Sequence, residues 1–272
     1  MASGGAAHWT AIEVDGSPME SYVALPDGSG PFPGVVVGMH LYGVDRGVRK
    51  FCDDLAHEGY AAIAPYFFHR NTDLTVHEYS SIAFDDPRRR EEAIIRGQAT
   101  GLDSLRQDVL GALAHLRTLP QVGDSPVGIT GFCLGGRLSL YAAGAMDAFA
   151  AAAIFYGTDM NRPRGGDPSP LSFAAGIRCP LAGFFGSEDQ NPSPADVDEV
   201  DAELDRLGVP HTFHRFEGSP HAFNDPFNPV RWTPEPAAEA WRLLIAFFDE
   251  SLRTPVQDSV RFREESGTHG GH

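Results

Sequence analysis

The chain has 272 residues, of which 42% are hydrophobic, and this is enough for one large domain with an ordinary buried core. Its 37 acidic and 21 basic residues give a formal net charge of -16, which disfavours nucleic acid and anionic membrane surfaces as partners. The N-terminus has no basic or apolar leader, no apolar run approaches the roughly 20 residues of a spanning helix, and three widely spaced cysteines fit free thiols, so we expect a cytoplasmic protein.

The first part of the chain predicts a hairpin followed by a strand, helix and strand. "TAIEV" (10–14) and "SYVAL" (21–25) alternate in polarity on either side of a turn. The continuous apolar run 34–39 is typical of a strand that is buried on both faces. Apolar residues at helical spacing then run from Val44 to Leu55, and 60–65 is a second buried strand. Short connections around one helix imply that these two strands are parallel.

The rest of the chain repeats this alternation. The charged segment 85–98 is typical of a solvated helix face, and 102–116 has helical spacing. Further strands are expected at 126–130, 149–157, 179–186 and 211–216, with helices at 138–146, 197–207 and 239–252. No repeat or linker divides the chain, so we predict one α/β domain over residues 1–255 with a mostly parallel sheet, and a disordered tail at 256–272.

The turn "GFCLGG" (131–136) stands between a predicted strand and a predicted helix. Its pattern is that of a nucleophile elbow with cysteine in place of serine, and the glycines allow the sharp reversal that exposes Cys133. A helix that starts at such a turn also offers backbone N–H groups, which lower the pKa of a thiol. Glycine-flanked cysteines also occur simply because small residues pack well there, so the turn alone leaves both interpretations open.

An acid and a base follow Cys133 in the order that this architecture needs. Asp189 comes after the strand 179–186, and His221 comes after the strand 211–216. Each has an ordinary alternative, since Asp189 fits a turn or helix cap and His221 fits a loop histidine. Three positions in the required order favour a catalytic triad of Cys133, His221 and Asp189.

Several segments resemble the dienelactone hydrolase family of carboxymethylenebutenolidase-like α/β-hydrolases. These segments are "GFCLGGRLSLYAA", "GSEDQNPSP", "SPHAFND" and the stretch 34–70, and the similarity runs from about residue 20 to about residue 250. The resemblance implies an α/β-hydrolase fold without a large cap domain. It also implies hydrolysis of an ester or lactone through a thioester, with an oxyanion hole formed by the backbone N–H groups of Leu134 and Leu41.

His40 stands where the family usually has a glutamate that helps to generate the thiolate. Two roles fit a histidine at this place. It can take up the thiol proton and remain as an imidazolium partner of Cys133, or it can fill the pocket and hydrogen-bond a backbone group.

The substrate pocket also departs from the family pattern, in which two arginines hold a substrate carboxylate. The register suggests Arg90 for the first arginine, with Arg88 and Arg89 as alternatives. Asp225 stands at the second place, where it would repel an anion, and Ala222 replaces a serine. With Tyr42, these complete the expected substrate-binding residues, and a neutral ester or lactone becomes the expected substrate.

The sequence therefore predicts a cysteine-dependent hydrolase of a small ester or lactone, without cofactor or metal, that is a monomer or a homodimer. Two alternatives remain open at this point. One is a thioesterase, cyclase or lyase on the same scaffold, and the other is a protein that binds small molecules or senses redox state without catalysis. Two histidines, His40 and His221, without a third ligand are weak support for a metal site.

Overall fold

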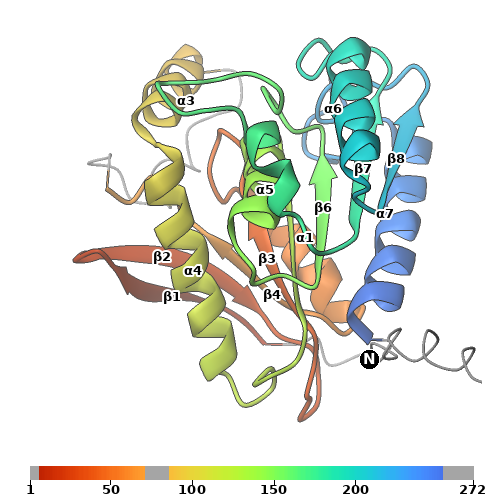
Figure 1. Cartoon of the computed structure of the whole chain (residues 1–272). Helices are drawn as coiled ribbons and strands as arrows, with labels where there is room; N and C mark the ends of the chain where they lie inside the picture. Colours follow the sequence, from red (N-terminus) through yellow and green to blue (C-terminus); the bar gives the residue numbers. More distant parts are fainter. Residues whose placement is uncertain (1–5, 71–85, 254–272) are drawn as a thin grey trace, which may run out of the picture.

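The computed structural model describes residues 6–70 and 86–253, which form an eight-stranded sheet with helices on both faces (Figure 1). The strand order is β1-β2-β4-β3-β5-β6-β7-β8. The strands are β1 Ala7–Val14, β2 Ser17–Ala24, β3 Gly34–Gly38, β4 Ala61–Pro65, β5 Val127–Phe132, β6 Ala151–Phe155, β7 Leu181–Gly186 and β8 His211–Phe216. The predicted tail at 256–272 lies outside the described residues.

The predicted hairpin and the predicted parallel sheet are both confirmed. β1 pairs with β2 in antiparallel register, and β2 joins the rest of the sheet through an antiparallel pairing with β4. From β4 to β8 every pairing is parallel. The strands β3 to β7 are buried along their whole length, as their continuous apolar runs require when helices cover both faces.

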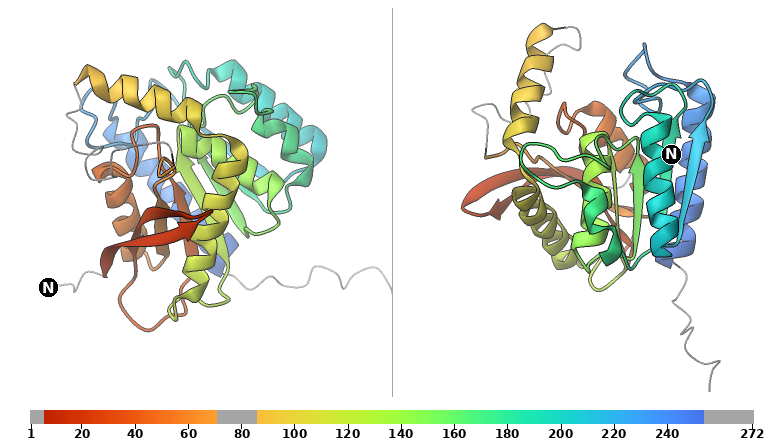
Figure 2. Two further views of the ribbon diagram at one scale, coloured as in Figure 1. Left: turned by 90° about the vertical axis from the view of Figure 1, so that its left-hand side faces the viewer. Right: turned by 45° about the horizontal axis from the view of Figure 1, so that its top comes forward.

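Six α-helices among the described residues cover the sheet. They are α1 Arg46–His57, α3 Pro87–Ala99, α4 Leu102–Thr118, α5 Leu134–Ala145, α6 Pro194–Leu207 and α7 Pro234–Phe248. α4, α5 and α6 lie on one face, and α1 and α7 lie together on the other, although α1 is near the start of the described chain and α7 near its end (Figures 1 and 2). In the part of the chain that the structure describes, no helix has both the length and the apolar character to cross a membrane.

Several element boundaries differ from those expected. α5 begins at Leu134 and not at residue 138, because the glycines after Cys133 are already helical. α7 begins at Pro234, five residues earlier than expected, since proline is well suited to the first turn of a helix. The short 3-10 helix Pro170–Gly176 has no apolar periodicity and was not predicted. The charged segment does form a helix, α3, but Arg89 and Arg96 are buried on its inner face.

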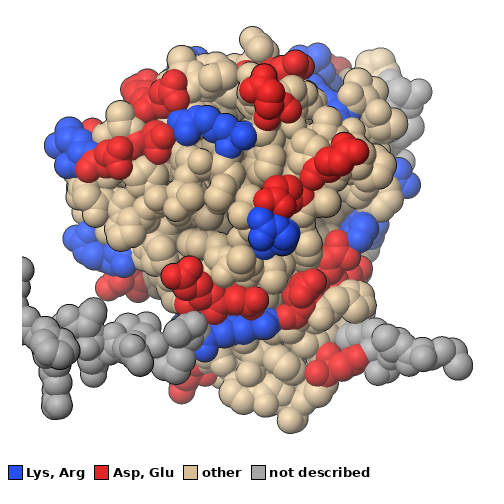
Figure 3. All heavy atoms as spheres, turned by 90° about the vertical axis from the view of Figure 1, so that its right-hand side faces the viewer, with Lys and Arg blue, Asp and Glu red and all other residues tan. Residues whose placement is uncertain are grey.

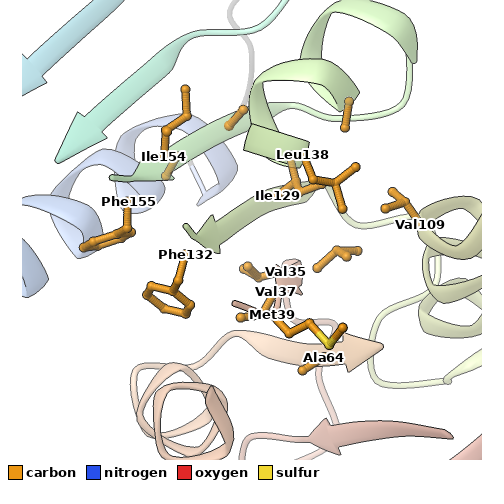
Figure 4. Packing of buried hydrophobic residues seen from close by; sticks show 14 of the residues in the cluster. Val35, Val37, Met39, Ala64, Val109, Ile129, Phe132, Leu138, Ile154 and Phe155 are labelled. Carbon is orange, nitrogen blue, oxygen red and sulfur yellow. The ribbon is translucent and has the colours of Figure 1, made fainter. Parts of the chain in front are cut away.

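The core fills the space between the sheet and its helices. Val35, Val37 and Ile129 from the central strands are fully buried. Figure 4 shows Ile129 beside Leu138 of α5 and Phe132 beside Phe155. This packing holds β3, β5 and β6 rigidly, and the loops at their carboxyl ends carry the residues described next.

Candidate active site

Four of the residues singled out from the sequence meet at the carboxyl edge of the sheet. His40 follows β3, Cys133 follows β5, Asp189 follows β7 and His221 follows β8. Because these strands are parallel, their carboxyl ends lie at one edge, where open α/β sheets bind their ligands.

Cys133 occupies a strained turn between β5 and α5. Its backbone has φ 55° and ψ -109°, a conformation that non-glycine residues rarely adopt outside functional sites. The Cys133 N–H donates to the carbonyl of Phe155 at 3.1 Å, and the Cys133 carbonyl accepts from the N–H groups of Arg137 and Thr158 at 3.0 and 3.2 Å. These bonds hold the turn against β6, and they fix the thiol at the start of α5.

The glycines of the turn have the steric role that the sequence suggests. A Cβ atom on Gly131 would lie 2.5 Å from the carbonyl of Gly135, closer than real Cβ atoms approach. A Cβ atom on Gly136 would lie 2.6 Å from the carbonyl oxygen of Phe155. The reversal from strand to helix is therefore so tight that backbone meets backbone at these positions.

His221 and Asp189 form a hydrogen-bonded pair. Nδ1 of His221 lies 2.7 Å from Oδ2 of Asp189. Asp189 is buried, and its other oxygen, Oδ1, accepts from the Asn191 N–H at 2.9 Å. Burial acts to lower the pKa of His221, but the Cys133 charge and the hydrogen bonds to Asp189 and Cys133 raise this pKa to about 10. Asp189 thus fixes the ring so that its other nitrogen serves the thiol.

The three cysteines differ in their acidity, and all three are free. Burial acts to raise the pKa of Cys133, but the charge and hydrogen bond of His221, the charge of His40 and the N–H of Leu134 together lower it. Burial raises the pKa of Cys52 well above the ordinary value and that of Cys179 to about 11. Of these three thiols, Cys133 therefore has the surroundings that favour the thiolate.

His40 contacts a backbone group and a second carboxylate. Its Nδ1 accepts a hydrogen bond from the Tyr42 N–H at 3.0 Å, and its Nε2 lies 3.3 Å from Oδ1 of Asp45. Burial and the Tyr42 N–H favour the neutral ring, whereas Asp45, Asp225 and the Cys133 thiolate favour the imidazolium. The carboxylates prevail, and the pKa of His40 is raised. The expected backbone hydrogen bond is present, and a histidine–aspartate pair accompanies it.

Asp45 was missed in the sequence because it looks like an ordinary helix cap. It is the N-cap of α1, and its Oδ1 accepts from the N–H groups of Gly47 and Val48 at 2.9 and 3.3 Å. Its Oδ2 accepts from Arg89 at 3.2 Å. Burial acts to raise the pKa of Asp45. The charge and hydrogen bond of His40, the Val48 N–H and the charge of Arg89 nevertheless hold this pKa well below its usual range. Asp45 is therefore a fixed negative charge behind His40.

The structure does not bring Arg90 to the site. Arg90 is exposed on α3, as is Arg88, which pairs with Asp86. Arg89 is buried and lies over the ring of Tyr42 at 4.8 Å. One residue along a helix turns the side chain by about 100°, which places Arg89, one of the alternatives named from the sequence, on the inner face of α3 and Arg90 on the outer face.

The remaining predicted residues surround this cluster. Tyr42 contacts His40 edge to face with 5.8 Å between ring centroids, and Ala222, next to His221, has a positive φ of 61°. Asp225 accepts from the Phe227 N–H at 2.9 Å, and burial followed by the Asp45 charge raises its pKa. Leu134 is the first residue of α5, and Leu41 follows His40 beyond the end of β3.

Tyr156 is a site residue that the sequence interpretation did not single out. It follows β6 with a positive φ of 36°, and its ring meets the ring of His221 edge to face at 4.8 Å. Its hydroxyl donates to Oδ1 of Asn224. Its place at the carboxyl end of a buried strand was the available signal. Among the residues that the structure describes, no group of three or more His, Cys, Asp or Glu side chains could hold a metal ion.

Comparison with known proteins gives a consistent result. The sequence model of the dienelactone hydrolase family matches residues 19–252. A protein of Synechocystis sp. named "Putative carboxymethylenebutenolidase" is 30% identical over 236 residues, which cover 85% of this chain and 92% of that protein. A protein of the same name from Escherichia coli K12 is 26% identical over 253 residues and covers 90% of this chain and 87% of its own length.

The fold agrees with a solved structure. The crystal structure of a "Putative Dienelactone Hydrolase" from Klebsiella pneumoniae superimposes with a TM-score of 0.79 and 26% identity, and covers 90% of this chain and 98% of that one. The α/β-hydrolase fold expected from the sequence is thereby confirmed. Since the family model spans most of the chain, the protein belongs to the dienelactone hydrolase family and is a hydrolase.

Proposed function

We propose that the protein hydrolyses a small ester or lactone through a thioester formed on Cys133. One observation carries this proposal. The strained turn at Cys133 lies at the same edge of the sheet as the hydrogen-bonded pair of His221 and Asp189, whose Nδ1 and Oδ2 atoms are 2.7 Å apart. The Cys133 thiolate attacks the carbonyl carbon, and the N–H groups of Leu134 and Leu41 stabilise the oxyanion, with each donor contributing about 3 kcal/mol.

His221 moves the protons in both halves of the reaction. Its imidazolium protonates the departing alkoxide or enolate, which leaves the acyl group on the sulfur. The neutral ring then takes a proton from water, the hydroxide attacks the thioester, and the acid departs as the thiolate is restored. Asp189 keeps the ring oriented and balances its positive charge throughout.

The test is an assay over aryl esters, lactones and thioesters, combined with rapid quenching and mass analysis of the protein. We expect an added acyl mass on the peptide that carries Cys133 during turnover. Product analysis separates hydrolysis from cyclisation or elimination, since only hydrolysis yields both the free acid and the alcohol. Turnover of esters with no adduct on that peptide, and with full activity after Cys133 is alkylated, would contradict the mechanism.

Within this mechanism we propose that His40 is a positioning residue that favours the thiolate as an imidazolium. The prediction concerns the pH at which Cys133 ionises. His40→Ala is expected to move the midpoint of thiolate absorbance to higher pH, because a neighbouring cation favours the charged form of a thiol. Cys52 and Cys179, with raised pKa values, stay protonated in this range and leave the signal to Cys133.

The direction of the change separates the two roles of His40. His8→Ala, on the exposed strand β1, is the matched control and should leave the midpoint in place. A neutral His40 beside the Asp45 carboxylate would give the opposite result, with an unchanged or lower midpoint in His40→Ala. Either of those outcomes would contradict the proposal that His40 acts as an imidazolium. The cytoplasmic location and the monomeric or homodimeric state expected from the sequence stay predictions.

A further inference from the structure

A cavity of about 300 Å³ opens between α1 and α7, on the face of the sheet that these two helices share. Each helix contributes one side, with residues three and four positions apart turned inward. The ends of β5 and β6 and the loop after His221 complete the walls. The residues used in the argument below are Phe51, Phe132, Phe155, Tyr156, Ala237 and Trp241.

Aromatic rings dominate the walls of this cavity. Phe51 meets Phe132 at 4.7 Å and Trp241 at 5.1 Å between centroids, both nearly perpendicular. Phe132 lies 5.3 Å from Phe155. Rings held in this way offer faces and edges to a further ring, and such contacts add to the gain from apolar burial.

The cavity lies next to the candidate catalytic groups, because two of its lining residues, Tyr156 and His40, act on His221 and Cys133. Tyr156 lines it and contacts the His221 ring at 4.8 Å. His40 lines it as well, and its charge is among the causes that lower the pKa of Cys133. Phe132, the residue before Cys133, lines the cavity too, so a group bound there lies close to the elbow. A cavity of about 150 Å³ suffices for benzene in another protein, so this one has room for one or two rings.

The charges around the cavity disfavour an anionic ligand. Asp225 lines the cavity, and Arg89 already contacts the Asp45 carboxylate at 3.2 Å. Lys50, the basic residue of the α1 wall, is paired with Asp54 at 2.8 Å. Figure 3 shows acidic and basic side chains in small mixed groups on the face turned to the right of Figure 1, with uncharged surface between them. The two basic residues that line the cavity, His40 and Lys50, are each paired with a carboxylate, and the nearby Arg46 lies over the Phe227 ring. A ligand carboxylate would therefore meet the Asp225 carboxylate without a cation in the cavity wall that is free of such a partner.

We propose that this cavity binds the ring of a neutral aromatic ester or lactone whose carbonyl lies at Cys133. This inference rests on the proposed function and names its substrate class. The substrate is neutral, because the walls supply ring contacts and the Asp225 carboxylate, which disfavours a carboxylate on the ligand.

The first test compares ethyl acetate, phenyl acetate and 4-acetoxybenzoate in a pH-stat assay. We expect kcat/KM for phenyl acetate to exceed that for 4-acetoxybenzoate by about tenfold or more, since the two differ chiefly in the carboxylate. Ala237→Phe fills the cavity and should lower the ratio of kcat/KM between phenyl and ethyl acetate by about tenfold. Ala114→Phe, exposed on α4, is the matched control and should leave that ratio unaltered.

A second variant tests the effect of the Asp225 charge without filling the cavity. Asp225→Asn keeps the shape and the oxygen that accepts from Phe227, and should bring 4-acetoxybenzoate close to phenyl acetate in kcat/KM. Equal use of both esters by the wild-type protein, or a ratio that Ala237→Phe leaves unaltered, would overturn the inference even if ester hydrolysis proceeds.

A binding measurement separates the cavity from the chemistry. Tryptophan fluorescence of Cys133→Ala protein is titrated with 4-nitrobenzyl alcohol and with 4-nitrobenzoate, because Trp241 lies in the cavity wall. We expect saturable quenching by the alcohol and about tenfold weaker binding of the benzoate. Quenching that does not saturate would overturn the cavity assignment. Saturable binding in a protein that hydrolyses no ester would support the cavity and contradict the proposed function.

Discussion

Cys133→Ala is expected to lower kcat/KM for an activated ester by about 10³-fold or more, because no other group can form the acyl intermediate. The residual rate would come from the oxyanion donors and from His221 acting on water. Initial rates on phenyl acetate, followed to high enzyme concentration, measure the loss. Cys179→Ala is the matched control, since that thiol is buried beside β7 and its raised pKa of about 11 keeps it protonated.

Two results of this experiment would be informative in different ways. A Cys133→Ala protein with more than a tenth of the wild-type rate would rule out Cys133 as the nucleophile. A loss of the same size in Cys179→Ala would instead point to damaged folding. Circular dichroism of both variants identifies the second case, because only a folding defect changes the spectrum.

Gly135→Ala is expected to have the largest effect on stability. A Cβ atom at this position would overlap the carbonyl of Gly38, and the neighbouring Met39 carbonyl oxygen lies 2.8 Å from it. Backbone on both sides leaves no side chain that can move aside, so α5 would have to shift away from β3. We expect the free energy of unfolding to fall by about 3 kcal/mol or more, at the upper end of overpacking effects.

Urea unfolding of the purified protein measures this loss. Gly101→Ala is a suitable control, because a Cβ atom there would meet Asp167 at an ordinary 3.4 Å and the φ of -86° suits alanine. The control should unfold within about 1 kcal/mol of the wild type. A Gly135→Ala protein as stable as this control would show that the elbow and β3 are not in close contact.

The two histidine–aspartate pairs have different relations to Cys133. His221 and Asp189 form the pair that a nucleophile elbow requires, and they lie after β8 and β7. His40 and Asp45 form a second pair after β3, with Arg89 on the far side of Asp45. If His40 is protonated, its imidazolium stabilises the Cys133 thiolate, whereas a neutral His40 leaves the Asp45 carboxylate to oppose it. The thiolate titration described above decides between these possibilities.

The sheet and the chain order of the candidate catalytic residues could both be predicted before the fold was known. Continuous apolar runs predict buried parallel strands, and the carboxyl ends of such strands must meet at one edge. Cys133, Asp189 and His221 could therefore be placed together without coordinates. The glycines of the elbow indicated a tight turn, but small-residue packing explained them equally well until Asp189 and His221 were found in the required order.

The surroundings of those residues could not be predicted, because they depend on contacts between distant segments. Asp45, the partner of His40, caps α1 with one carboxylate oxygen. The sequence around a helix cap does not indicate that Arg89 reaches the other oxygen. The choice of Arg89 over Arg90 depends on the rotation of α3, which apolar periodicity does not define in so charged a segment. The aromatic cavity is lined by residues of both α1 and α7. Segments so distant in sequence come together because both pack on one face of the sheet, and a local sequence pattern does not predict this.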